Sequence, residues 1–248
     1  WALLNMTLPK NTCYATEAWL DEFMQGFLSL DEEVVLVGGN LSEGPLNIGV
    51  VLMGEVAPNQ AITRRGSCVG DALVVTGTLG DAAMALQLKT HKKHVDKDLQ
   101  ARLHRPTPRV VAGQHAAAHV HAMIDISDGL LADLSHLLDA AQDDDGQKKL
   151  GAEIHLDLLP MSEAFKAQKL PDAHRWNLQL SGGNDYELLM SVAPPRLDAL
   201  LSELQSINIQ ATVIGQVISE PNVFLFDHHG DKFRPASQGW DHFKEPIK

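Results

Sequence analysis

The sequence has 248 residues, of which 44% are hydrophobic, so it can bury the core of one large domain or of two small ones. Its 32 acidic and 20 basic residues give a formal net charge of −12, which argues against an extended surface for the phosphates of a nucleic acid. A site for a phosphorylated small molecule is compatible with this charge, because such a site needs only a few cations or a bound metal.

The two cysteines, Cys13 and Cys68, are far apart and have no metal-ligand spacing, so a reducing compartment is expected and a disulfide framework is not. The sequence has no apolar run of about 18 residues and no basic segment followed by an apolar one, as a membrane span or a secretory signal would require. We therefore expect a cytoplasmic protein. The hydrophobic start at Trp1 is typical of the interior of a domain rather than of a natural N-terminus.

The first half of the chain predicts strands that alternate with helices. A β-branched run at 34–37 predicts a buried strand that ends in a tight turn at Gly38 and Gly39, and residues 47–56 are extended between two prolines. A strand at 72–76 leads through a glycine-rich turn into a helix, which Asp81 favours at its N-terminus. Helices are predicted at 82–88, 96–103 and 109–119.

A short strand at 122–126 runs into Ser127-Asp128-Gly129 and then into an amphipathic helix, whose leucines recur at helical spacing. The polar run 142–149 predicts a solvated loop. Further strands are predicted at 153–158, 186–192, 213–217 and 223–226, and a helix at 195–207 begins with proline, which is tolerated there. The pattern indicates a mixed α/β fold, with a domain boundary near residues 57–60.

The strongest local signal is Asp125-Ile126-Ser127-Asp128-Gly129. Its two carboxylates and hydroxyl come where a strand ends and a helix begins, which is where ligands of α/β sheets bind and where backbone N–H groups favour an anion. Carboxylates that face a phosphate need a cation between them, which predicts Mg²⁺. For an isolated motif of this kind, simple capping of the helix by Ser127 or Asp128 is the more common explanation.

Two other glycine-rich segments, 38–45 and 181–188, could let the backbone approach a ligand, but each alone is equally typical of a turn. Four arginines could contact phosphate, although each could equally be a surface charge: Arg64, Arg65, Arg105 and Arg109. The twelve histidines, among them His115, His119 and His121, show no convincing zinc spacing and are interpreted as structural or exposed.

Taken together and in order, the segments are far more specific than any one of them. They read G-G-N-x-x-x-G-P-L, T-R-R-G, G-D-A-L-V-V-T-G-T-L-G-D-A-A, R-P-T-P-R, D-I-S-D-G-L-x-x-D-L, L-S-G-G-N-D-Y-E-L and G-W-D-H-F. From Trp1 to about Pro246 the chain resembles the thiamine-monophosphate kinase family, of the superfamily that includes aminoimidazole ribonucleotide synthetase. The resemblance implies a mixed α/β (α+β) architecture of two domains. A remnant of the ATP-binding N-terminal domain would span residues 1–57 and the C-terminal domain residues 58–248.

The resemblance also implies the reaction: the γ-phosphoryl group of ATP is transferred to thiamine monophosphate, with Mg²⁺, to give thiamine diphosphate. A cluster of carboxylates that holds metal suits a phosphoryl transfer, which depends on positioning and on neutralised oxygen charge. By position, Asp125 and Asp128 resemble the family's metal ligands, with Asp128 as the catalytic residue. The other matched positions are Ser127 for ATP, Arg64 for the ATP phosphates, Gly39 beside the nucleotide and Trp240 for the thiamine ring.

Two positions depart from the family pattern. Asn40 replaces an aspartate that is a metal ligand, and Asn184 replaces a glutamate that touches the substrate. We expect Asn40 to weaken Mg²⁺ binding and Asn184 to weaken recognition of thiamine, while Glu43 stands where a basic residue is common. These departures favour an alternative, a degenerate relative that binds a nucleotide or a partner without turnover. A superfamily enzyme with another substrate is disfavoured by the G-W-D-H-F ending.

Family members also carry an upstream segment with further aspartate motifs, and none precedes Trp1 here. The N-terminal domain is therefore expected to be incomplete, with its last helix and about two strands. The family is homodimeric through that domain, an expectation that the missing segment weakens for this chain. No nucleic-acid or membrane partner is expected.

Overall fold

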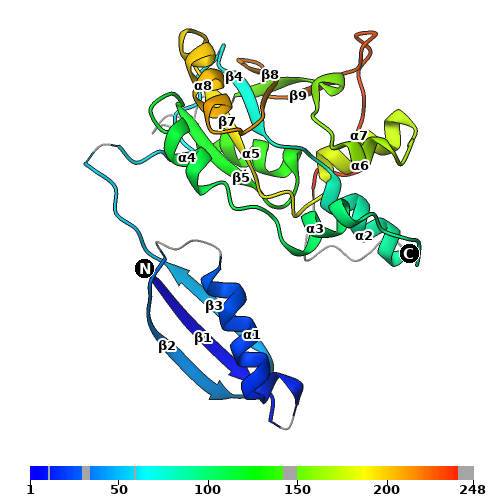
Figure 1. Cartoon of the computed structure of the whole chain (residues 1–248). Coiled ribbons are helices and arrows are strands. Elements are labelled where there is room, and N and C mark those ends of the chain that lie inside the picture. The colour runs from blue at the N-terminus through cyan, green and yellow to red at the C-terminus, as the bar shows by residue number, and fades with distance from the viewer. Residues whose placement is uncertain (11, 30–33, 59, 142–149, 240–248) are drawn as a thin grey trace. The chain divides into compact units, whose positions relative to one another are not determined.

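The computed structural model describes residues 1–10, 12–29, 34–58, 60–141 and 150–239. Contacts within the chain divide it into two compact units, Trp1–Gln60 and Ala61–Lys248 (Figure 1). The sequence had suggested a boundary after residue 57. Among the described residues, no helix is both long enough and apolar enough to cross a membrane.

The first unit is a three-stranded sheet with a helix across it. Its strands are β1 (Ala2–Leu8), β2 (Leu36–Glu43) and β3 (Asn47–Leu52), and they lie in the order β2-β1-β3. Helix α1 (Glu17–Leu28) connects β1 to β2, which run parallel, as a parallel pair requires a crossover. Strand β3 follows β2 directly and pairs antiparallel with β1.

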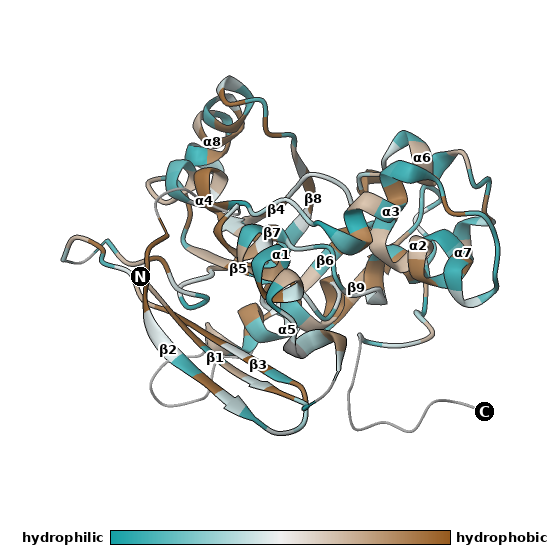
Figure 2. Ribbon diagram, turned by 60° about the horizontal axis from the view of Figure 1, so that its bottom comes forward, coloured by the Kyte–Doolittle hydropathy of each residue, from teal (hydrophilic) through white to brown (hydrophobic). Residues whose placement is uncertain are grey.

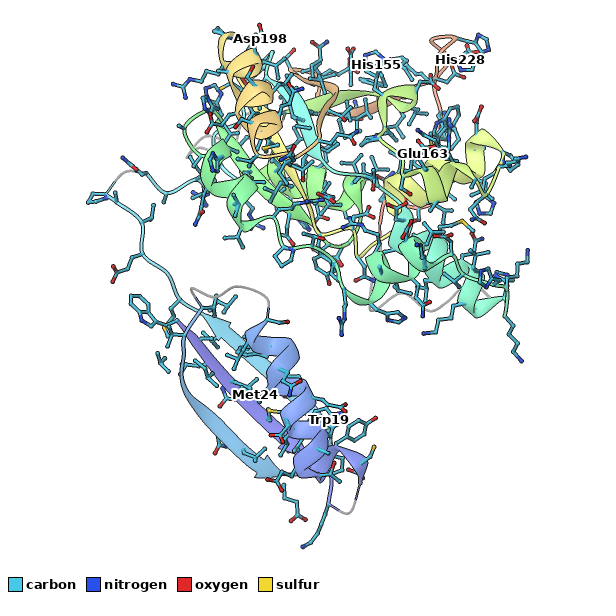
Figure 3. All side chains as sticks on the ribbon, in the orientation of Figure 1. Trp19, Met24, His155, Glu163, Asp198 and His228 are labelled. Carbon is cyan, nitrogen blue, oxygen red and sulfur yellow. The ribbon has the colours of Figure 1, made fainter. Side chains whose placement is uncertain are left out.

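The core of the first unit lies between β1 and α1. Alternate residues Leu4, Met6 and Leu8 are buried on one face of β1, because successive side chains of a strand point to opposite faces. Trp19 and Met24 of α1 pack against them, and Figure 3 labels both on this helix. Figure 2 shows the apolar residues of β1 and β3 in brown; several of those on β3 are exposed, including Val50 and Leu52.

The prediction for residues 34–39 was wrong. The strand begins at Leu36 and continues through Gly38 and Gly39 to Glu43, and most of it is exposed rather than buried. The physical reason is non-local: β1 supplies a partner for every residue of this stretch from Gly38 on, and Gly39 lies opposite Leu4. The pairing overrides the tendency of two glycines to end a strand. The unit also has three strands rather than the two or so expected.

The second unit is built on a six-stranded mixed sheet in the order β5-β7-β4-β8-β6-β9. All neighbours in it run antiparallel except β6 and β9. The strands are β4 (Ala72–Thr76), β5 (Ala122–Ile126), β6 (Gly151–His155), β7 (Glu187–Val192), β8 (Ala211–Ile218) and β9 (Val223–Phe226). The helices are α2 (Asp81–Thr90), α3 (Lys97–His104), α4 (Val110–Ala116), α5 (Leu130–Ala140), α6 (Glu163–Lys166), α7 (Asp172–Ser181) and α8 (Pro194–Ser206).

Helices cover both faces of this sheet. On the central strand β4, Leu73 and Val75 face a core that includes leucines of α5 and α7, whereas Ala72 and Val74 face a second core with α4 and α8. Figure 1 shows α4 and α8 on the opposite side of the strands from α5. Because both faces are covered, β4 is a continuous apolar run, as a central strand needs.

Most of the elements predicted in this unit are present, and strands 72–76, 122–126 and 223–226 have the predicted bounds. The predicted strand 153–158 was partly wrong, because the segment Leu156–Leu158 turns as a short 3-10 helix. Helices α6 and α7 were not predicted from the sequence. The predicted loop 142–149 lies outside the described residues. The mixed α/β class is confirmed.

Candidate functional site

Two loops that are far apart in the sequence meet at the ends of β5 and α7. The backbone N–H of Asn184 donates to the carbonyl oxygen of Ser127 at 2.8 Å, and the N–H of Tyr186 donates to that of Ile126 at 2.8 Å. The segment after β5 and the segment after α7 are thereby held together by their backbones. The strongest local motif of the sequence and a glycine-rich segment that alone is equally typical of a turn are thus neighbours in the structure.

Gly183 makes this approach possible. A Cβ atom added at Gly183 would lie 2.7 Å from the carbonyl oxygen of Ser127, closer than real Cβ atoms come to another heavy atom. A larger residue would force the two loops apart. The second glycine of the pair is therefore required by packing.

A cavity of about 720 Å³ lies beside the two loops, with α2 as a further wall. Ser127 and Asp128 line it from one loop and Asn184 from the other, so three residues singled out from the sequence share one cavity. Its lining also includes residues from α2 and from the end of α7: Ala82, Ala83, Leu86, Gln87, Thr90, His91, Leu178, Ser181, Gly182, Gly183 and Tyr186.

Asp133, to which the sequence analysis gave no role, holds the first loop in shape. Its buried carboxylate accepts the backbone N–H groups of Ser127 at 2.9 Å and of Asp128 at 3.1 Å. Burial raises the pKa of the Asp133 carboxyl, and the charges of Asp128 and Asp125 raise it further. The two hydrogen bonds lower the pKa, but the net shift is upward. Asp133 thus occupies the N–H groups of the loop before α5, and the expectation that an anion binds at the helix start stays a prediction.

Simple capping does not explain Ser127 and Asp128. Helix α5 begins after Gly129, which has a φ of 114° and no side chain to cap with. The side chains of Ser127 and Asp128 make no hydrogen bond to any residue that the structure describes. Both are half-buried at the cavity, and so they are available to a ligand.

Asp125 and Asp128 suit a hard cation. Asp125 is exposed on β5, which is an edge strand, and its carboxylate likewise has no hydrogen-bond partner among the described residues. Both charges act on Asp133, so three carboxylates gather at the end of β5. Unpaired carboxylate oxygens in such a group are the ligands that Mg²⁺ prefers.

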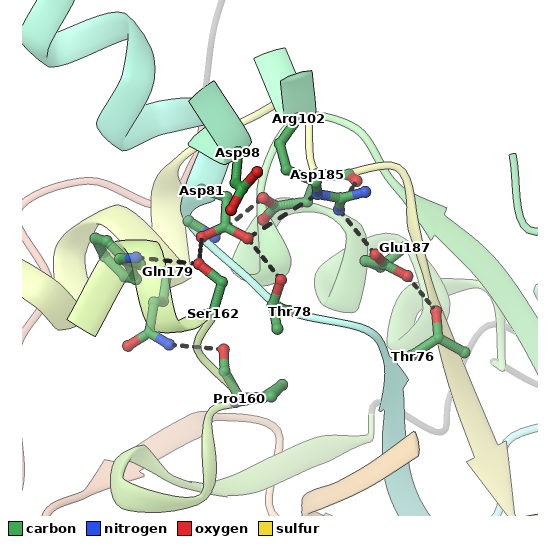
Figure 4. Close-up of polar contacts among 12 residues, drawn as sticks. Thr76, Thr78, Asp81, Asp98, Arg102, Pro160, Ser162, Gln179, Asp185 and Glu187 are labelled. Carbon is green, nitrogen blue, oxygen red and sulfur yellow. Dashed lines mark hydrogen bonds and ion pairs between the residues drawn. The ribbon is translucent and has the colours of Figure 1, made fainter. Parts of the chain in front are cut away.

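A buried polar network supports the second loop (Figure 4). Glu187, fully buried at the start of β7, accepts two hydrogen bonds from Arg109, Nε at 2.6 Å and Nη2 at 2.7 Å, and one from Arg102 Nη2 at 2.8 Å. Thr76 donates to the same carboxylate at 2.7 Å. Arg109 is thus one half of a buried ion pair. The sequence had left open whether Arg109 contacts phosphate or is a surface charge, and the structure pairs it with Glu187.

Asp185 lies in the same network between the two loops and α2. Its Oδ1 accepts the N–H of Gly80 at 3.0 Å, and its Oδ2 is buried without a hydrogen-bond partner among the described residues. Burial raises the pKa of the Asp185 carboxyl well above its usual value, and the neighbouring charges of Asp81 and Glu187 also raise it. A protonated Asp185 fits this setting, since a buried carboxylate needs compensation that the single Arg102 gives only in part.

The remaining predicted positions are Arg64, Gly39, Asn40 and Trp240. Arg64 is exposed in the segment before β4, whose Thr63 carbonyl accepts the N–H of Met123 at 3.1 Å. Gly39 and Asn40 are exposed on β2 and belong to the first unit. Trp240 lies outside the described residues. The structure brings together Asp125, Ser127, Asp128 and Asn184.

Comparison with known proteins gives concordant results. The family model for the C-terminal domain of AIR synthase related proteins matches residues 69–228. The chain is 36% identical to the thiamine-monophosphate kinase of Haemophilus influenzae and 35% identical to that of Escherichia coli K12. In both cases the match covers 99% of this chain and 74% of the relative.

Two solved structures have the same fold. The crystal structure of thiamine-monophosphate kinase from Stenotrophomonas maltophilia superimposes with a TM-score of 0.81 at 35% identity, over 91% of this chain and 71% of the other. The structure of AaThiL complexed with AMPPCP and TMP superimposes with a TM-score of 0.79 at 31% identity, over 98% and 73%.

Proposed function

This chain belongs to the thiamine-monophosphate kinase family, and we propose that it transfers the γ-phosphoryl group of ATP to thiamine monophosphate, with Mg²⁺, to give thiamine diphosphate. One observation carries the proposal for the site. The Ser127-Asp128 loop and the Asn184 loop are hydrogen-bonded to each other at the wall of one cavity, and the carboxylates of Asp125 and Asp128 have no partner among the described residues.

The related AaThiL supports the choice of substrates. It was solved with AMPPCP, an analogue of ATP, and with TMP, which we take as thiamine monophosphate. The cavity of about 720 Å³ is of the size that holds small ligands. We assign Asn184 to the thiamine monophosphate, Ser127 and Arg64 to ATP, and Gly39 to the approach of the nucleotide.

Asp125 and Asp128 would hold Mg²⁺, with Asn40 as a further oxygen ligand. When bound, the metal supplies neutralisation of phosphate oxygen charge, which is the main requirement of phosphoryl transfer. The protein's own contribution is positional: Asp133 fixes the backbone of Ser127 and Asp128, and the Asn184–Ser127 hydrogen bond fixes the two loops relative to each other.

The second candidate is a relative that binds ligand without turnover. The observation that favours it is the loss of two carboxylates, since amides stand at positions 40 and 184. Glu43 favours the second candidate less than the sequence suggested, because Lys10 lies 3.5 Å from its carboxylate and offsets part of the charge.

The two unpaired cysteines, Cys13 and Cys68, support a cytoplasmic location for either function. The homodimer stays a prediction.

The test is chromatographic detection of thiamine diphosphate after incubation of the purified full chain with thiamine monophosphate, ATP and Mg²⁺. We expect product that depends on ATP and on Mg²⁺ and that Asp128→Asn removes. Asp139→Asn, an exposed residue of the same helix region, is the matched control and should keep the activity. Protein that is folded by circular dichroism but makes no product would overturn the kinase proposal in favour of the second candidate.

A further inference from the structure

Cys68, Asp71 and His121 form a cluster that the proposed kinase site does not use, called the Cys68 cluster below. One potential ligand atom from each, a sulfur, a carboxylate oxygen and an imidazole nitrogen, lies within 4.8 Å of the other two. None of the three lines the cavity beside Asp128. The sequence gave no indication of this cluster, because His121 is far along the chain from the other two residues.

The fold builds the cluster from a turn and a strand end. The N–H of Asp71 donates to the carbonyl oxygen of Cys68 at 3.1 Å, which closes a four-residue turn, and Gly70 supplies the positive φ of 91° that its third position requires. His121 immediately precedes β5, and its N–H donates to the carbonyl oxygen of Ser191 on β7 at 2.8 Å. Each residue is therefore held by backbone hydrogen bonds.

Asp71 carries a buried carboxylate that lacks a strong cation. It is 2% exposed and accepts hydrogen bonds from Ser191 Oγ at 2.6 Å, from the N–H of Cys68 at 2.9 Å and from His121 Nδ1 at 2.9 Å. Across the described part of the chain, no lysine or arginine forms an ion pair with it. A buried carboxylate needs a positive partner, and a metal ion held jointly with Cys68 and His121 would supply one.

The donor set selects the metal. We propose that Cys68, Asp71 and His121 bind a Zn²⁺ ion, with solvent in the fourth position. Thiolate, imidazole and carboxylate are the three ligand types of zinc sites, whereas Mg²⁺ prefers oxygen ligands alone. The Cys68 side chain is exposed, so an ion and its water can reach the cluster from solvent. Binding releases the thiol proton of Cys68 to solvent, since the thiolate is the ligand.

Such an ion would tie two parts of the second unit together. The segment that carries Arg64 and Cys68 leads into β4, and it already contacts the neighbourhood of β5 through the Thr63–Met123 hydrogen bond. The hydrogen bond between His121 and Asp71 is a second contact, and metal bonds to Cys68 and His121 would strengthen this connection between the segment and the start of β5. The proposed role of the ion is to link these two segments, and this role is independent of the proposed kinase chemistry.

The experiment is a titration of the reduced, metal-free full chain with Co²⁺, in the presence of excess Mg²⁺ to occupy oxygen-rich sites. A thiolate ligand gives Co²⁺ a sulfur-to-metal charge-transfer absorption, so this band reports the cysteine bond and not activity. We expect the band at one equivalent of Co²⁺, its loss on addition of Zn²⁺, and its absence in Cys68→Ser. Cys13→Ser, at the other cysteine of the chain, should keep it.

The histidine is tested in the same way. His121→Ala should weaken binding by about 100-fold or more, since removal of even an outer-shell group costs a metal site about 10- to 100-fold. His119→Ala, two residues earlier, is the matched control and should leave the affinity unchanged. The proposal is overturned if the wild-type chain shows no charge-transfer band, if Cys68→Ser retains it, or if His121→Ala binds as tightly as the wild type.

Discussion

The backbone N–H of Asn184 donates to the carbonyl oxygen of Ser127 at 2.8 Å. This hydrogen bond uses only main-chain atoms, so it does not depend on the side chains of Asn184 and Ser127. The side chains at the cavity can therefore be changed one at a time while the loops keep their relative position. The predictions for Asp128 and Asn184 depend on this separation.

Asp128→Asn should abolish Mg²⁺-dependent turnover, with a loss of about 100-fold or more, because the amide removes the negative charge that faces the cation. The fold should be unaffected, since the Asp128 side chain has no partner among the residues that the structure describes. Steady-state kinetics as a function of Mg²⁺ concentration measures the effect. Activity within about two-fold of the wild type would contradict the metal assignment.

Asn184→Gly should raise the KM for thiamine monophosphate and leave the KM for ATP unchanged. Asn184 has a φ of 68°, which glycine adopts without strain, so the substitution removes the side chain and preserves the loop. Asn208→Gly is the matched control, because Asn208 has a φ of 58° and is exposed after α8. Equal effects on both substrates, or an equal effect of the control, would count against the assignment of Asn184 to thiamine.

Asn40→Asp should tighten Mg²⁺ binding in the presence of ADP, because it restores a carboxylate beside the cation. Asn40 is exposed on β2, so the added charge has no burial cost. Asn47→Asp, on the exposed strand β3 of the same unit, makes the same change of charge at a residue to which the proposal gives no role. Calorimetric titration with Mg²⁺ distinguishes the two, and an equal gain in both would mean only a general effect of charge.

Glu187→Gln should destabilise the second unit by about 3–5 kcal/mol, as the breaking of a buried ion pair does. The amide would present an N–H₂ group to Arg109 and Arg102, which lose a negative partner in a largely buried setting. The carboxylate is also closely packed, because a Cβ atom at Gly77 would overlap it. Urea unfolding measures the change.

The control for Glu187 is Glu163→Gln, which breaks an exposed pair with Lys166. The unfolding midpoint should move little, because surface ion pairs contribute almost nothing to stability. Equal shifts in the two variants would show that the buried network does not support the fold.

Asp185→Asn should become more stable relative to the wild type as the pH rises. The pKa of Asp185 is raised in the folded state, so between about pH 4 and that raised pKa the folded chain holds a proton that the unfolded chain has lost. The stability of the wild type therefore falls with rising pH in this window, by about 1.4 kcal/mol per pH unit for one proton. Asparagine keeps the oxygen that accepts the Gly80 N–H and cannot ionise.

Urea midpoints of both proteins at about pH 5 and about pH 8 measure this difference. The midpoint of the asparagine variant should change less than that of the wild type. If both proteins lose the same stability between the two pH values, Asp185 is not the group that takes up the proton.

Local pattern was sufficient where one face of an element is buried in a regular way. Helix α5 was predicted because its leucines recur at helical spacing, and the strand predicted at 72–76 has the bounds of β4. Local sequence pattern failed where a neighbouring strand or the core determines the structure of a segment. Strand β2 continues through Gly38 and Gly39 because β1 pairs with it, and α7 packs on the core through Trp176 and Leu180 although its residues are mostly polar.

The sequence by itself determined the family and the mixed α/β class, and it predicted Asp125, Ser127, Asp128 and Asn184 as site residues, because ordered motifs and their spacing are properties of a linear chain. Only the tertiary structure decided which of these residues share a cavity and that Asp133 occupies the N–H groups of their loop. It also assembled the Glu187–Arg109 pair and the Cys68 cluster. The physical reason is that burial, ion pairing and metal-ligand distance depend on residues that are brought together by folding from distant parts of the chain.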